Sequence, residues 1–213
     1  MLTVHHLGIS QSDRIVWLCE ELEIPYELRR YQRDPVTKLA PPEYKALHPA
    51  ATAPIVTDGD LVLAESGAII EYIIARHGGG RLTVAPDSAG YPDYLFWYHF
   101  ANGSFMPACM IGFVLNQLAG GQEDETRRSL RTRGDRAFAM VEDRLGRVPY
   151  FAGNAFTAAD IIMFFPLTTM RLFVPRDITA LPHLRAYLQR IGERPAFQRA
   201  MRKADPDLPP NLS

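Results

Sequence analysis

The segment from Ala53 to Tyr72 constrains the fold of this chain more than any other stretch of its sequence. It contains two short β-branched or aliphatic runs, Val56-Thr57 and Leu61-Val62-Leu63, joined by Asp58-Gly59, a dipeptide that accepts the positive φ angles of a tight turn. We therefore expect an antiparallel hairpin. Pro54 opens its first strand, and because a proline cannot donate to a sheet ladder, it belongs at an edge, at a first position or at a cis peptide bond.

The predicted hairpin runs into a helix through Glu65-Ser66. Apolar residues then recur at helical spacing until three glycines end the run: Ile69, Ile70, Ile73 and Ile74, followed by Gly78, Gly79 and Gly80. Ser66 stands where a helix N-cap is expected. Because the start of a helix carries unpaired N–H groups and a partial positive charge, Ser66 either caps its own helix or helps to hold a ligand carboxylate.

The N-terminal residues predict a β-α-β unit. Leu2 to Leu7 reads as a strand, the apolar stripe from Ile15 to Leu22 as an amphipathic helix, and Tyr26 to Arg30 as a second strand. A crossover of this kind implies parallel pairing of the two strands. In the loop, Ser10 and Asp13 have the spacing of a capping box, and the Ser10 hydroxyl can both cap the helix and donate to a ligand.

Beyond residue 81 the pattern changes from mixed to helical. Pro86 and its neighbours interrupt both periodicities between Arg81 and Tyr91, which predicts a linker at residues 82–90. The remaining chain predicts helices at about residues 91–117, 123–145, 157–172, 182–193 and 196–201. Pro107 is expected to bend the first of them. The sequence therefore predicts two domains, residues 1–81 with mixed structure and residues 91–213 with helices alone.

Composition narrows the classes of function. The chain has 213 residues and a formal net charge of −1 at pH 7, so it can build two cores and carries no excess charge that would attract nucleic acid. No apolar run is long enough to span a bilayer, and the six histidines do not pair with cysteine or aspartate at a metal-ligand spacing. Two cysteines without a CxxC pair, and a start that does not resemble a leader, indicate a reducing compartment. We expect a cytoplasmic protein without a metal, a nucleic-acid partner or a membrane partner.

The first half of the chain resembles the thioredoxin-like domain of the cytosolic glutathione transferase family. The resemblance rests on the expected order β-α-β-α-β-β-α and on three motifs placed along it. A serine, Ser10, lies in the first βα loop, Ala53-Pro54 opens the third strand, and Glu65-Ser66 opens the third helix.

The helical half adds a further motif. The segment from Phe151 to Ile161 resembles the start of a helix in that family's second domain, with Thr157 and Asp160 at the Ncap and N3 positions of a capping box and apolar residues on either side. Within the family, His5-His6-Leu7 and the segment Tyr98 to Pro107 are most similar to a bacterial and fungal branch that uses serine in the first loop.

The resemblance implies a fold, an activity and a site. The fold is an α/β thioredoxin-like domain followed by an all-α domain, and the activity is conjugation of glutathione to small apolar electrophiles. Carried over to this sequence, Ser10 donates a hydrogen bond to the glutathione sulfur, with Ser12 as the alternative donor. Ala53 pairs its backbone with the cysteinyl unit beside a cis Ala53-Pro54 bond, and Glu65 and Ser66 hold the γ-glutamyl end. The family also implies a homodimer.

Two features of the implied site remain open at this point. Tyr98, Asn102, Phe105 and Met106 share one helix face, which either lines the pocket for the electrophile or packs between the domains. Many relatives have Gly-Lys where this chain has Ala51-Thr52, so the lysine that could contact the glutathione carboxylate is missing and we expect weaker binding of glutathione.

Two other classes of function fit the same residues. In a glutathione-dependent peroxidase or disulfide reductase, the bound thiolate attacks a peroxide or a disulfide. The first loop contains no cysteine, which argues against a mixed disulfide with the protein but not against chemistry through glutathione itself. A non-catalytic binding module is the other class, because a fold alone does not prove catalysis.

Overall fold

The computed structural model describes residues 1–118 and 124–213 and divides into two compact units. The first unit comprises Met1–Thr83 together with Gly192–Pro210, and the second comprises Val84–Ile191 together with Asn211–Ser213. The chain crosses from one unit to the other inside the predicted linker. The prediction that residues 91–213 form one helical domain is wrong for residues 192–210, which pack with the thioredoxin-like unit.

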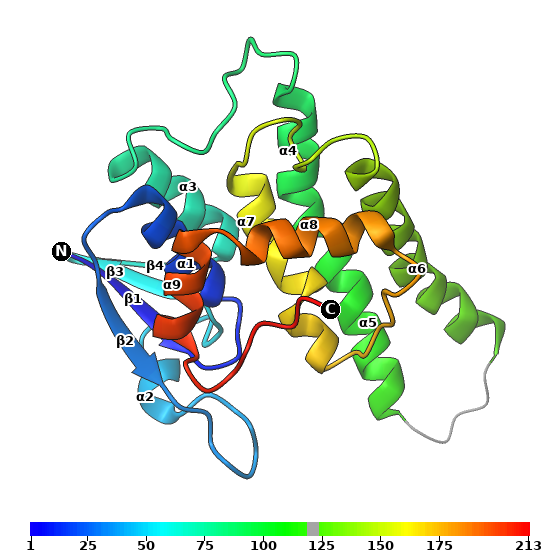
Figure 1. The fold of residues 1–213 in the computed structure, drawn as a ribbon. Helices are drawn as coiled ribbons and strands as arrows, with labels where there is room; N and C mark the ends of the chain where they lie inside the picture. The colour runs from blue at the N-terminus through cyan, green and yellow to red at the C-terminus, as the bar shows by residue number, and fades with distance from the viewer. Residues whose placement is uncertain (119–123) are drawn as a thin grey trace. The chain divides into compact units, whose positions relative to one another are not determined.

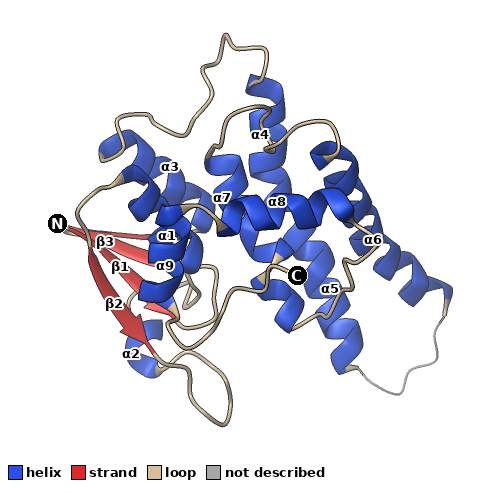
Figure 2. Cartoon of the chain, in the orientation of Figure 1, coloured by secondary structure: helices blue, strands red, loops and turns tan. Residues whose placement is uncertain are grey.

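The first unit is built on a four-stranded sheet with the order β2-β1-β3-β4 (Figures 1 and 2). Its strands are β1 (Leu2–Leu7), β2 (Glu27–Tyr31), β3 (Ile55–Asp58) and β4 (Leu61–Ala64). β1 pairs parallel with β2 and antiparallel with β3, as the predicted crossover and hairpin require. In the hairpin, Asp58 pairs with Leu61, so Gly59 and Asp60 form the turn and Gly59 takes the positive φ of 58°.

Helices cover the sheet, and α1 (Asp13–Leu22) and α3 (Ser66–Arg76) pack against each other. The short α2 (Pro42–Lys45) brings Tyr44 into a separate apolar cluster with β-strand residues. That cluster contains Leu7, Tyr44, Ile55 and Ala64, with Ala53 packed against it. The three glycines end α3 as expected, since the helix stops at Arg76 and Gly79 and Gly80 have φ angles of 60° and 75°.

The last helix of the chain, α9 (Pro195–Ala204), packs on α1 (Figure 1). Trp17 of α1 and Phe197 of α9 meet edge to face with their ring centroids 5.2 Å apart. Arg194 holds the Glu21 carboxylate through two hydrogen bonds of 2.7 Å. The sequence predicted a short helix here, at residues 196–201, but it did not predict which surface would cover the helix.

The second unit is helical in its described residues. Its elements are α4 (Tyr91–Phe100), the π-helix η1 (Ala101–Phe105), α5 (Met106–Gln117), α6 (Glu125–Leu145), α7 (Ala158–Leu167), the 3-10 helix η2 (Thr169–Leu172) and α8 (Pro182–Gly192), whose last residue belongs to the first unit. The expected bend at Pro107 takes the form of the π-helical turn just before it. The predicted start of the second helix at Glu123 lies outside the described residues. Among the described helices, none is both long and apolar enough to cross a membrane.

The predicted capping box at the start of α7 is confirmed. Thr157 is the N-cap, its hydroxyl accepts the N–H of Ala159 at 3.3 Å, and its own N–H donates to Oδ2 of Asp160 at 2.8 Å. The other carboxylate oxygen of Asp160 accepts from the Phe151 N–H at 3.0 Å and from the Tyr187 hydroxyl at 3.3 Å. Burial raises the pKa of Asp160 to about 6, although these hydrogen bonds oppose the rise.

Candidate functional site

The first βα loop, residues 8–12, does not form the predicted capping box in the described chain. Helix α1 begins at Asp13, and Ser12 rather than Ser10 is its N-cap. The Ser10 hydroxyl instead donates back to the Leu7 carbonyl at 2.6 Å, while Ser12 Oγ accepts the Leu7 N–H at 3.2 Å. Both serine hydroxyls are therefore bonded to the end of β1, and Ser10 Oγ also accepts the backbone N–H of Ser12 at 3.3 Å.

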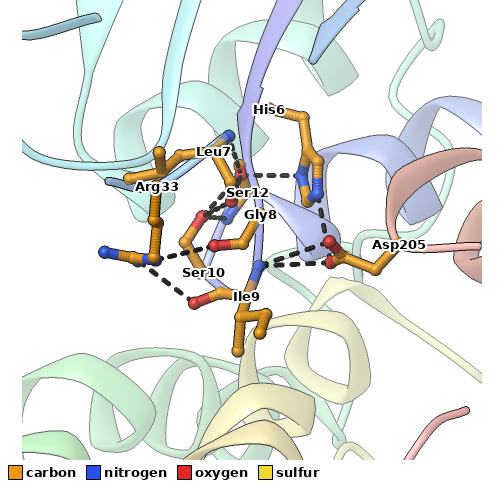
Figure 3. A network of polar contacts seen from close by, with 8 residues as sticks. All are labelled: His6, Leu7, Gly8, Ile9, Ser10, Ser12, Arg33 and Asp205. Carbon is orange, nitrogen blue, oxygen red and sulfur yellow. Dashed lines mark hydrogen bonds and ion pairs between the residues drawn. The ribbon is translucent and has the colours of Figure 1, made fainter. Parts of the chain in front are cut away.

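The two serine side chains lie in contact with each other (Figure 3). Their Oγ atoms are 2.7 Å apart, and Ser12 Oγ lies 2.8 Å from Nδ1 of His6. Ser12 is completely buried, whereas Ser10 retains 5% of its surface exposed. Both side chains are therefore buried, and Ser10 is the slightly more exposed of the two.

The second part of the predicted site precedes β3. The Ala53-Pro54 peptide bond is cis, as the resemblance implied. Ala53 is partly buried against the apolar cluster around Tyr44, which fixes the position of its backbone. Ala51, just before it, has a φ of 51°, a left-handed conformation that is uncommon for residues other than glycine.

The third part is the start of α3, and here the expected N-cap is corrected. The N-cap is Glu65, with a φ of 75°, and Ser66 is the first residue of the helix. The Ser66 side chain is 2% exposed and donates to Oε1 of Gln11 across 3.5 Å. This contact joins the start of α3 to the first βα loop. The two ends of the predicted glutathione site therefore lie in one unit of the structure and meet through Gln11.

The predicted electrophile residues lie on the second unit. Phe105 is completely buried and contacts the edge of Phe138 with ring centroids 5.0 Å apart, so it lies in the core of the second unit itself. Tyr98 and Met106 are 3% and 7% exposed, and Asn102 is half-buried.

Sequence reasoning missed three residues that hold the first loop. Nε2 of His6 lies 3.1 Å from Oδ2 of Asp205, and the guanidinium of Arg33 donates to the Gly8 carbonyl at 2.8 Å and to the Ile9 carbonyl at 3.1 Å (Figure 3). The neighbouring His5 points to the other face of the sheet, as strand geometry predicted. Spacing could not reveal Asp205, because it is 199 residues from His6.

Both halves of the chain match known domains. Residues 10–76 match the glutathione S-transferase N-terminal domain, and residues 102–195 match the glutathione S-transferase C-terminal domain. The chain is 32% identical to glutathione S-transferase 3 of Schizosaccharomyces pombe over 223 aligned positions, which cover 96% of this chain and 88% of the relative.

Solved structures agree with these matches. A crystal structure of a glutathione S-transferase from Actinobacillus pleuropneumoniae superposes with a TM-score of 0.87 at 33% identity, covering 96% of this chain and 93% of the other. A sphingomonad glutathione S-transferase in complex with glutathione has the same fold, with a TM-score of 0.75 at 22% identity over 95% of this chain and 98% of the other. With both domains matched and a relative 32% identical along nearly its whole length, this chain belongs to the glutathione S-transferase family.

Proposed function

We propose that this glutathione transferase binds glutathione along the first βα loop, the cis Ala53-Pro54 bond and the start of α3, and that Ser10 stabilises the thiolate. The observation that carries the proposal is the contact between Ser66 and Gln11, which brings the two predicted ends of the ligand site together. The exposure of Ser10, compared with the complete burial of Ser12, favours Ser10 as the donor.

The proposed chemistry is energetically reasonable. A free thiol has a pKa of about 8.5, and only the thiolate is a strong nucleophile. Lowering that pKa by about 2 units requires roughly 2.7 kcal/mol of preferential stabilisation of the thiolate. One hydrogen bond to a charged group contributes about 1.5–3 kcal/mol, and the start of a helix adds roughly 0.3–1 kcal/mol. One hydrogen bond from Ser10, together with the N-terminus of α1, is therefore sufficient to lower the thiol pKa by this amount.

The γ-glutamyl end is proposed to lie at the start of α3. Glu65 is exposed and can pair with the ligand ammonium group, while Ser66 and the first N–H groups of the helix can hold the carboxylate. Ser66 is available for this role because Glu65, and not Ser66, is the N-cap.

The co-substrate is proposed to be a small apolar electrophile that contacts Tyr98, Asn102 and Met106. Phe105 supports this segment from within the core of the second unit. Asn102 and Phe105 belong to the π-helical turn η1, and π-helical turns occur frequently at functional sites.

A second candidate activity is glutathione-dependent reduction of peroxides or disulfides, in which the cysteines of the chain would take no direct part. Cys19 and Cys109 are both buried, and burial raises the pKa of both thiols, that of Cys109 to about 11. Reduction would therefore proceed through the bound glutathione thiolate. The third hypothesis is a non-catalytic binding module of the same fold. Turnover of any substrate with glutathione would exclude it.

The test measures turnover of an aryl halide and of an organic hydroperoxide with glutathione, and binding of glutathione by calorimetry. We expect Ser10→Ala to lower kcat/KM roughly 10- to 100-fold, the loss of one charged hydrogen bond, and Ser12→Ala to lower it less. A wild-type protein that neither binds nor turns over glutathione contradicts the proposal. A larger loss in Ser12→Ala than in Ser10→Ala assigns the thiolate to Ser12.

We also propose a cytoplasmic homodimer, supported by the family and by the two free cysteines. Sedimentation equilibrium should give twice the chain mass of 24.0 kDa. A mass of one chain at micromolar concentration contradicts the dimer.

A further inference from the structure

The first βα loop is held by residues from two distant segments of the first unit. Ile9 has a φ of 53°, a conformation that a β-branched residue adopts rarely. Its N–H donates to the carboxylate of Asp205, with distances of 3.3 Å and 3.4 Å to the two oxygens, and its carbonyl accepts from Arg33. Asp205 follows α9, so the segment after the last helix fixes the backbone just before Ser10.

Asp205 also determines where the proton of His6 lies. His6 is completely buried, and its Nε2 atom is 3.1 Å from Oδ2 of Asp205. An ionised carboxylate only accepts hydrogen bonds, so Nε2 carries the proton and donates it. In the neutral imidazole, Nδ1 is then an acceptor, and Ser12 Oγ donates to it across 2.8 Å.

This arrangement orders the two serine hydroxyls. Because Ser12 gives its only proton to His6, its oxygen is an acceptor toward Ser10 at 2.7 Å. Ser10 therefore stands at the donating end of this series of hydrogen bonds, and its proton has two acceptors within reach, Ser12 Oγ and the Leu7 carbonyl. It can turn to a bound sulfur without breaking the bonds from Ser12 to His6 and from His6 to Asp205.

We propose that His6 and Asp205 are positioning residues for Ser10: they fix the direction of the hydrogen bonds so that Ser10 is the hydroxyl that donates to the glutathione thiolate. The inference rests on the proposed function, because it requires a thiolate beside Ser10. The proposal assigns to Asp205, which follows the last helix, a role in positioning the first βα loop. Figure 3 shows the complete series of contacts from Ser10 to Asp205.

Several charged groups lie near His6, and a change in any of them could also change the pH dependence of the bound thiol. Besides Asp205, they are Asp13 and Arg14 at the start of α1, Arg30 opposite His6 in the register of β2, and Arg33, which interacts with Asp205. A matched control must leave all of these in place. Asp207 provides one, since it is exposed, carries the same charge and lies two residues beyond Asp205.

The test compares Asp205→Asn with Asp207→Asn in the full-length protein. In Asp205→Asn, the amide oxygen of the new side chain can still accept the Ile9 N–H, but its NH₂ group donates to Nε2 of His6 and moves the ring proton to Nδ1. Nitrogen-15 NMR of the histidine rings should therefore show a proton on Nε2 in the wild type and in Asp207→Asn, and on Nδ1 in Asp205→Asn. A proton on Nδ1 in the wild type overturns the proposal.

The second measurement follows the ultraviolet absorbance of the bound glutathione thiolate against pH. We expect Asp205→Asn to raise the thiol pKa by about one unit and to lower kcat/KM about 10-fold below that pKa, with a dissociation constant for glutathione within about 3-fold of the wild type. Ser12→Ala, which breaks the same series of hydrogen bonds without touching Ile9, should shift the thiol pKa in the same direction. Equal thiol pKa values in Asp205→Asn and Asp207→Asn overturn the positioning role, whereas a wild type that binds no glutathione contradicts the proposed function itself.

Discussion

At the scale of single residues, the hydroxyls of Ser10 and Ser66 are the most informative groups, because neither residue is the N-cap of its helix. Ser10 is bonded to the end of β1 and Ser66 to Gln11. Serine at a helix start is ordinarily an N-cap. The Ser10 hydroxyl accepts the N–H of Ser12 and also donates to the Leu7 carbonyl, and Ser66 is the first residue of α3 rather than its cap. Each hydroxyl lies beside the start of a helix, as the proposed glutathione site requires.

Ser66→Ala should therefore weaken glutathione binding without unfolding the protein. We expect the dissociation constant to rise about 5- to 10-fold, equivalent to a lost hydrogen bond of about 1–1.4 kcal/mol, because the ligand carboxylate loses one donor. The thiol pKa should not change, since Ser66 acts at the other end of the ligand. Calorimetry measures the affinity, and Ser129→Ala on the exposed face of α6 is the control. A fall in Tm without a change in affinity would show that Ser66 has only a structural role.

The site residues that could be predicted from the sequence belong to local motifs, whereas those that could not be predicted depend on contacts between distant segments. Ser10, Pro54 and Ser66 stand at recognisable turns and helix starts, so local pattern marked them as candidates, and the family resemblance then implied their roles at a glutathione site. His6 and Asp205 acquire meaning only through contact with each other, which the fold creates between the first strand and the segment after the last helix. The N-caps were misassigned because a serine near a helix start fits capping equally well one or two residues either way.

At the scale of elements, the start of α7 is held by a complete capping box. Asp160 is completely buried, and its two oxygens accept hydrogen bonds from Thr157, Phe151 and Tyr187. These hydrogen bonds join the start of α7 to the Phe151 segment and to α8. In Asp160→Asn, an NH₂ group would face one of the donors, and that hydrogen bond would be lost.

The pH dependence of this cap has a defined sign. The pKa of Asp160 is raised from 3.8 to about 6, so between these values the folded state holds a proton that the unfolded state releases. Below about pH 4 the bound proton stabilises the folded state by about 3 kcal/mol. This stabilisation is lost as the pH rises through 6. Asp160→Asn does not titrate. The stability difference between wild type and variant should therefore shrink by about that amount from pH 4 to pH 7.

Urea unfolding at several pH values measures this difference, with the exposed Asp87→Asn as the control. Asp13, whose pKa burial also raises to about 6, titrates in both proteins and cancels in the comparison. A difference that grows with pH would show that Asp160 is ionised throughout and stabilised by its hydrogen bonds.

The order of elements was predictable because each has its own periodicity, and the β-α-β-α-β-β-α pattern of the first unit is confirmed. The packing partner of α9 was not predictable. An amphipathic helix shows that it has a surface to bury, but not which surface accepts it. Arg194 and Phe197 meet α1 only because the chain returns to its first unit at its end.

At the scale of the whole molecule, this return means that the thioredoxin-like unit is assembled from both ends of the chain. Without residues 192–210, the side chain of Trp17 loses its contact with Phe197, and Glu21 loses the guanidinium of Arg194. The same truncation removes Asp205, the hydrogen-bond partner of His6 and of the Ile9 N–H. The first 83 residues therefore lack part of their own core and the carboxylate that holds the first loop.

We predict that a fragment of residues 1–83 is at most marginally folded and that a peptide of residues 192–210 restores its structure when added. Trp17 is the only tryptophan of that fragment, so its fluorescence reports the binding of α9 directly. A peptide with Phe197→Ala should bind at least 30-fold more weakly, because removing a buried phenylalanine costs about 3–5 kcal/mol. A fragment that is equally stable with and without the peptide, by circular dichroism in urea, would show that α9 only covers the unit. If both peptides bind equally, the Trp17 contact is not what holds α9 in place.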